Sequence, residues 1–346
     1  MENVKDKVKN EKYRNWVKST LGIEQTGRAL YEYVENKFSD YTHSKSTLAG
    51  VSFLDHTELF HIRNGGCFLS NLSNNVKQLK SPNGKGTSKS KWQWTGSCQT
   101  CKTSFEKILL LYENPCRKDI CWENSHKSVH SITLEWAIAK MFMPPGNGSK
   151  NTGPKTTEPL ALFQLIRACK LFKIDSVGQL EKLTEARNNL FHSSDNHVDE
   201  KDMKDYFQYM DELLKNVTED KDVDQGTRDR VAKCNEKIEK LKHSEMTMAL
   251  FDDALKLKRK AIFDDFEKSL SENDPDALKE LLELAVKTVA EIQELKKYAD
   301  EVKNIDSYKK EIDELRLEIS KGDAYCSVLI IILTIIVASL FRIYFS

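Results

Sequence analysis

The stretch from Ser176 to Ser194 decides the fold that we expect; it reads Ser-Val-Gly-Gln-Leu-Glu-Lys-Leu-Thr-Glu-Ala-Arg-Asn-Asn-Leu-Phe-His-Ser-Ser. Ser176 is followed three residues later by Gln179, which fits a capping box at a helix N-terminus. Apolar residues then recur at steps of three and four, the spacing of one helix face: Val177, Leu180, Leu183, Ala186 and Leu190. The stretch therefore predicts a helix with one buried face.

The last turn of this predicted helix carries Arg187, Asn188 and His192. Asn188 and His192 share a face, whereas Arg187 and His192 point about 140° away from each other at 100° per residue. If all three serve one site, either the helix breaks near Phe191 or a second copy of the chain supplies the missing group. In a simpler interpretation Arg187 and His192 only stabilise the helix C-terminus, where positive charge is favoured.

Composition restricts the partners that this chain can attract. It has 346 residues, 39% hydrophobic and 31% charged, enough for one or two ordinary domains plus extensions. Lys plus Arg and Asp plus Glu both total 53, so no overall field recruits RNA or an anionic membrane. A local patch would have to do so. Seven lysines against one Glu between Lys77 and Lys107 could bind an RNA backbone, or form a solvated loop.

A cysteine-rich module lies between Trp92 and Trp136. The chain starts with alternating charges and no secretory signal, so we expect its eight cysteines to be reduced thiols. Cys98 and Cys101 have the C-x2-C spacing that directs two thiolates at one tetrahedral zinc ion. We expect Cys121 and His126 to complete a structural zinc site, with Cys116 and His130 as alternates. A redox pair and plain buried thiols are the other interpretations.

The order of motifs from Trp92 to Ser194 resembles the HEPN superfamily. The motifs are Cys-x-x-Cys, Cys121-Trp-Glu-Asn124, Trp136 to Gly146, Leu162 to Cys169, and Arg187-Asn-Asn-Leu-Phe-His-Ser-Ser194. They look like a vertebrate uncharacterised family named after an X-chromosome open reading frame, and they are also similar to the HEPN domain of the DAZ-interacting zinc-finger ubiquitin ligase. The resemblance implies a helical bundle, often a dimer, with a metal-independent RNA-cleaving site shared across its two-fold axis. Ser125 and Cys121 stand where the vertebrate family has Cys and His.

The predicted fold class is all-α, in three parts. Residues 1–218 would form the HEPN-like helical bundle, with the zinc insert at about 92–136. Residues 219–322 are charge-rich, with a 3–4 apolar seam from Leu278 to Val302 that resumes one step early at Ile305, as in coiled-coil helices. This stalk could be an intramolecular antiparallel hairpin or pair with another chain.

The third part is a predicted C-terminal transmembrane helix at 324–345. Ala324 to Phe341 has no charged residue over 18 positions and would span about 27 Å as a helix. With no signal sequence, this predicts a tail anchor whose folded part faces the cytosol. The flanking Lys321 and Arg342 favour the endoplasmic reticulum over the outer mitochondrial membrane.

Two functions of different classes fit this sequence. In the first, a membrane-anchored HEPN-like protein binds RNA and acts as a metal-independent endoribonuclease. His192 would be the general acid or base, Arg187 would stabilise the phosphorane, and Asn188 would orient the phosphate or His192. In the second, the chain is a non-catalytic scaffold in innate signalling at a membrane. Both versions predict a homo-oligomer through the helical domain and the coiled coil.

Overall fold

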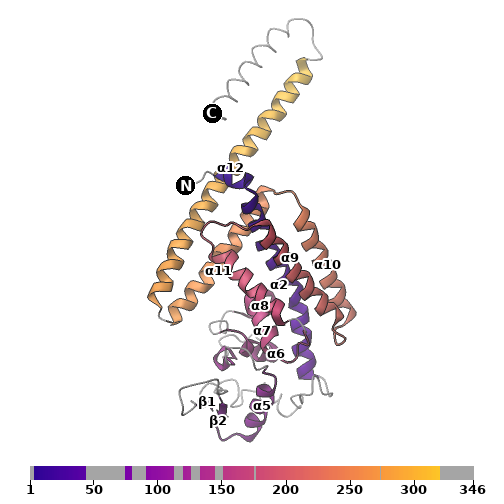
Figure 1. Cartoon of the computed structure of the whole chain (residues 1–346), viewed down its shortest axis with the longest axis vertical. Coiled ribbons are helices and arrows are strands. Elements are labelled where there is room, and N and C mark those ends of the chain that lie inside the picture. Colours follow the sequence, from indigo (N-terminus) through magenta and orange to yellow (C-terminus); the bar gives the residue numbers. More distant parts are fainter. Residues whose placement is uncertain are drawn as a thin grey trace. The chain divides into compact units, whose positions relative to one another are not determined.

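The computed structural model describes residues 4–43, 75–79, 91–112, 120–125, 133–144, 151–174, 177–272 and 274–319. The chain divides into two compact units, Met1–Ile292 and Gln293–Ser346. Each unit is treated by itself, and the candidate site lies wholly in the first. Helices make up most of the described residues (Figure 1).

The helices differ widely in length. The long ones are α2 (Glu11–His43), α8 (Val177–His192), α9 (Glu200–Glu219), α10 (Gln225–His243), α11 (Met248–Glu272) and α12 (Pro275–Ile319). The shorter ones are α1 (Val4–Lys9), α5 (Gln99–Leu110), α6 (Leu134–Ala139) and α7 (Pro159–Ala168), with 3-10 turns at Trp122–Ser125, Lys140–Phe142 and Pro154–Thr156. A two-stranded antiparallel sheet joins β1 (Val76–Leu79) to β2 (Lys91–Trp94) and pairs Val76 with Trp94. This small sheet was not predicted.

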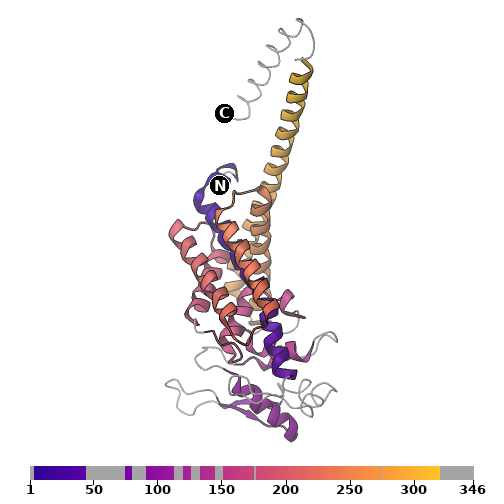
Figure 2. The same ribbon diagram turned by 90° about the vertical axis from the view of Figure 1, so that its right-hand side faces the viewer.

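Helix α2 is the centre of the first unit. It contacts α7, α8, α9, α10 and α11, which lie around it in both views (Figures 1 and 2). Its aromatic stripe is buried, and Trp16 donates its indole N–H to the carbonyl of Leu190 at 2.8 Å. The carboxylate of Asp220, at the end of α9, pairs with Lys37 at 2.8 Å and accepts from the Tyr33 hydroxyl at 2.9 Å. These contacts fix α8 and α9 against α2.

The close approach of α7 to α2 depends on a glycine. A Cβ added to Gly27 would lie 2.6 Å from Cγ of Pro159, the first residue of α7. Only a residue without a side chain allows the start of α7 to lie here. The contact therefore sets the position of Glu158, the residue before α7.

The helix predicted around the Arg-His motif is confirmed. α8 runs from Val177 to His192, and the predicted face residues Leu180, Leu183, Ala186 and Leu190 are buried. Ser176, the predicted capping residue, lies outside the described residues.

The first compact unit extends beyond residue 218, where the sequence placed the end of the helical domain. α10 packs against α2 and α9, and α11 packs against α2 and α8. Their apolar residues, including Val231, Phe251 and Ile262, are buried. In the first unit the charge-rich region thus supplies core as well as solvated surface.

The zinc insert of the predicted fold class is corrected by the structure. Among the described residues, no group of three or more His, Cys, Asp or Glu side chains could hold a metal ion. Cys101 and Cys121 are buried and Cys98 is half-buried. Burial raises the pKa of the Cys121 thiol to about 11. His126, Cys116 and His130 lie outside the described residues.

The prediction of a transmembrane helix, which was part of the predicted fold class, is also corrected. In the part of the chain that the structure describes, no helix combines the length and the apolar character needed to cross a membrane. Residues 324–345, where that helix was predicted, lie outside the described residues.

Candidate functional site

The site is built around Arg187, which α8 places in the interior. Its side chain is only 1% exposed and lies between two carboxylates from distant parts of the chain. Nε donates to Oε1 of Glu158 at 2.6 Å, and Nη2 forms an ion pair with the same oxygen. On the other side, Nη1 donates to Oδ2 of Asp265 at 3.3 Å. Arg187 therefore links the start of α7, the end of α8 and α11.

The buried positive charge of Arg187 is compensated by the two carboxylates beside it. Burial alone would lower the pKa of Arg187, but the carboxylates of Glu158 and Asp265 outweigh it and hold the pKa above its ordinary value. Burial raises the pKa of Glu158, against the effect of the Arg187 charge. The charge of the guanidinium is thus compensated within the protein. It is not an open site for a phosphate.

His192, the last residue of α8, reaches the same carboxylate from the surface. Its side chain is 43% exposed, and Nε2 lies 3.4 Å from Oδ2 of Asp265, the oxygen that also accepts from Arg187. Two side chains that diverge on one helix therefore meet at a carboxylate supplied by another helix of the same chain. Neither a break near Phe191 nor a second copy is needed for this contact.

The protonation state of His192 suits a proton acceptor. Burial lowers the pKa of His192, and the charges of Arg187 and Lys258 lower it further, against the opposing effect of Asp265. The imidazole is therefore neutral at pH 7. The carboxylate next to Nε2 favours the tautomer with its proton on Nε2, which leaves Nδ1 as the acceptor.

His192 stands between two cavities. The smaller, about 480 Å³, lies between the end of α8, the segment 193–198 and the start of α9, and its polar lining includes Asn188, Asn189, Ser193, His197, Asp202 and Tyr206. The larger, about 580 Å³, lies between the end of α8, α11 and α12, and is lined by Asp265, Glu280, Glu283 and Lys287 among others. Three carboxylates line the larger cavity, which disfavours a polyanion there. The smaller one is more nearly neutral.

Comparison with known protein families assigns this chain to one of them. The model of a domain of unknown function, DUF4559, matches residues 67–322. The chain belongs to the DUF4559 family. Neither a curated protein nor a solved structure matches it. The residues matched by the DUF4559 model include Glu158, Arg187, His192 and Asp265.

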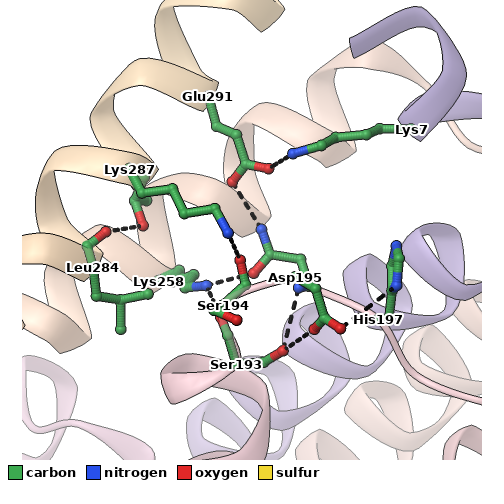
Figure 3. Close-up of polar contacts among 11 residues, drawn as sticks. Lys7, Ser193, Ser194, Asp195, His197, Lys258, Leu284, Lys287 and Glu291 are labelled. Carbon is green, nitrogen blue, oxygen red and sulfur yellow. Dashed lines mark hydrogen bonds and ion pairs between the residues drawn. The ribbon is translucent and has the colours of Figure 1, made fainter. Parts of the chain in front are cut away.

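In this DUF4559 chain the segment after His192 is held by a buried lysine. Lys258 on α11 is 1% exposed, and its Nζ donates to the carbonyl of Ser193 and to Oδ1 of Asn196 (Figure 3). Asn196 has a φ of 57°, in the left-handed region that Asn adopts more readily than most residues. Burial lowers the pKa of Lys258 to about 8.

In the DUF4559 chain, α12 also contacts this segment directly, and α1 supports it through a contact with α12. Lys287 on α12 donates to the carbonyl of Ser194, and Nδ2 of Asn196 donates to Oε2 of Glu291 at 2.8 Å (Figure 3). Lys7 of α1 pairs with Glu291 in turn. Elements from both ends of the first unit thus fix the backbone next to His192.

The predicted site residues are brought together only in part. Arg187 and His192 share Asp265, while Asn188 accepts from Nη1 of Arg187 through Oδ1 at 3.3 Å. Sequence reasoning missed Glu158 and Asp265. The acidic pair Asp264-Asp265 inside an otherwise periodic helix was the one signal, but charge is common on such helices.

Proposed function

We propose that this chain cleaves RNA without a metal ion, with His192 as the acid–base residue and Asp265 as the residue that positions it. The observation that supports this most directly is the 3.4 Å contact between His192 Nε2 and Asp265 Oδ2, on a half-exposed side chain between two cavities. A carboxylate behind an imidazole fixes its tautomer and orientation and stabilises the imidazolium that forms on proton transfer. That pairing favours acid–base chemistry over simple helix capping.

RNA is proposed as the substrate because the motif resembles that of the HEPN superfamily at Arg187, Asn188 and His192. RNA also carries its own nucleophile, the ribose 2′-hydroxyl, so the protein has to supply a base and no nucleophile. Nδ1 of His192 would take the 2′-hydroxyl proton while O2′ bonds to phosphorus and the bond from phosphorus to the 5′-oxygen breaks. Water protonates that oxygen. The products are a 2′,3′-cyclic phosphate and a free 5′-hydroxyl, and His192 returns its proton to solvent.

Arg187 has a different role in this proposal from the one that the sequence suggested. Its guanidinium is buried and bonded to Glu158 and Asp265, so it acts through Asp265 and not on the phosphate. It is a positioning residue. Its charge also helps to keep His192 neutral, because it lowers the pKa of that imidazole.

The second candidate function, a non-catalytic scaffold, is favoured by a specific observation. The Glu158–Arg187–Asp265 cluster satisfies its own charges and joins three helical segments, as a structural cluster would. Homo-oligomerisation and a place at the cytosolic face of a membrane, which the sequence suggested for both functions, stay predictions.

The deciding experiment uses the purified full-length chain and end-labelled single-stranded RNA, with EDTA present. The wild type is expected to produce fragments with cyclic phosphate ends, and His192→Ala should abolish them. His243→Ala is the matched control, because His243 also ends a helix, α10, but is exposed away from the site. An inactive wild type would overturn the proposal in favour of the scaffold. A fully active His192→Ala would show instead that His192 is not the acid–base residue.

A further inference from the structure

The smaller cavity beside His192 has the size and the walls of a binding site for one nucleoside. Its volume, about 480 Å³, falls within the range of small-molecule pockets in proteins, roughly 300–1,000 Å³. Two amide side chains, Asn188 and Asn189, line it together with hydroxyl groups and the imidazoles of His192 and His197. Such groups donate and accept hydrogen bonds without carrying a fixed charge. The cavity is therefore suited to a polar, uncharged ring system.

Tyr206 supplies an aromatic wall in this cavity. It projects from the second turn of α9, is half-buried, and lines the cavity together with Asn189. Burial raises the pKa of Tyr206, so the hydroxyl stays protonated at neutral pH. Unpaired bases of RNA characteristically stack on Tyr rings.

Asp202 determines which base the cavity would prefer. It lies one turn before Tyr206 on α9, is exposed, and is the one carboxylate among the residues that line the cavity. A carboxylate repels phosphate but accepts two parallel N–H bonds in a bidentate arrangement. Guanine offers two adjacent donors, N1–H and the N2 amino group. Adenine, cytosine and uracil do not present such a pair on their Watson–Crick edges.

We propose that this cavity binds a guanine base, with Asp202 accepting from N1–H and the N2 amino group and Tyr206 stacking on the ring. The proposal rests on the proposed function for its substrate class, RNA, and adds the specificity. A guanosine held here places its own ribose next to His192, which lines the same cavity. The bond cleaved is therefore the one on the 3′ side of a guanosine.

Binding is measured first, without any cleavage step. Full-length wild type is titrated by calorimetry with guanosine 3′-monophosphate and with adenosine 3′-monophosphate. We expect the guanosine nucleotide to bind about tenfold more tightly, as one bidentate contact confers. Asp202→Asn should remove this difference in affinity between the two nucleotides, and Tyr206→Leu should weaken the binding of both. The matched control is Asp205→Asn, since Asp205 lies on the same helix but is not among the residues that line the cavity.

Cleavage is measured second, on RNAs that differ in one nucleotide at a single unpaired position. Wild type is expected to cut after G at least tenfold faster than after A, and Asp202→Asn to cut after both equally. Equal binding of the two nucleotides, or an unchanged preference in Asp202→Asn, would overturn the guanine site. RNA cleavage without preference for G overturns this inference alone. Selective nucleotide binding without any cleavage overturns the proposed function and leaves the guanine site standing.

Discussion

Replacing Arg187 with Met is the most direct test of the buried charge cluster. The side chain is 1% exposed, and its removal leaves the carboxylates of Glu158 and Asp265 facing each other without a counter-charge. Breaking a buried pair from one side costs about 3–5 kcal/mol. Because the two carboxylates are 19% and 25% exposed, water can partly solvate them, so we expect the lower end, about 3 kcal/mol. For a unit of this size, that loss corresponds to a fall in melting temperature of roughly 5 °C.

The assay is urea unfolding of the full-length protein, followed by circular dichroism. Arg28→Met is the matched control, since Arg28 is 54% exposed and pairs with Glu24 one turn away; we expect a change below about 0.5 kcal/mol. Adding Glu158→Gln to Arg187→Met should restore stability, because it removes one of the uncompensated charges. If the free energy of unfolding of Arg187→Met lies within about 1 kcal/mol of the wild-type value, Arg187 is not held in the interior as described.

Three further predictions concern the surroundings of the cluster. The folded-state pKa of His192 lies below its ordinary 6.5, so stability should fall as pH drops from 6.5 towards that lower pKa, and His192→Gln should flatten this dependence in thermal melts. Lys258→Met should lower the unfolding free energy by about 2 kcal/mol, because Ser193 and Asn196 lose their donor, while the exposed Lys260→Met should not. Gly27→Ala should destabilise by about 1–3 kcal/mol, since its Cβ would overlap Pro159, whereas Gly178→Ala, with nothing within 4 Å, should be neutral or stabilising.

The sequence predicted local features of the site better than long-range ones. The three- and four-residue spacing from Val177 to Leu190 predicted α8, because one helix repeats its buried face at a fixed interval. It also predicted that Arg187 and His192 diverge on that helix. Glu158 and Asp265 lie 29 and 78 residues away from Arg187 in sequence, and no local pattern connects them to it. Only the packing of α7 and α11 against α8 brings their carboxylates to one place.

The corrected zinc insert shows why spacing alone is a weak guide. Cys98 and Cys101 have the right separation for a zinc site, but Cys101 is buried on the same face of α5 as Phe105, and Cys98 is only half-buried. The same C-x2-C spacing on a helix also places two small apolar side chains about one turn apart, which a packed core accepts equally well. Sequence cannot separate these outcomes without the positions of the other two ligands.

The convergence of distant helices on the segment 193–196 decides how this protein can be dissected. A fragment that ends at residue 218 would lack Lys258, Lys287 and Glu291, and the carbonyls of Ser193 and Ser194 would lose their donors. It would also uncover Tyr13, whose ring stacks on Phe251 at 5.5 Å. Such a fragment should be prone to aggregation. The smallest piece expected to fold on its own therefore extends at least to Ile292, so deletion experiments that stop earlier would report misfolding in place of function.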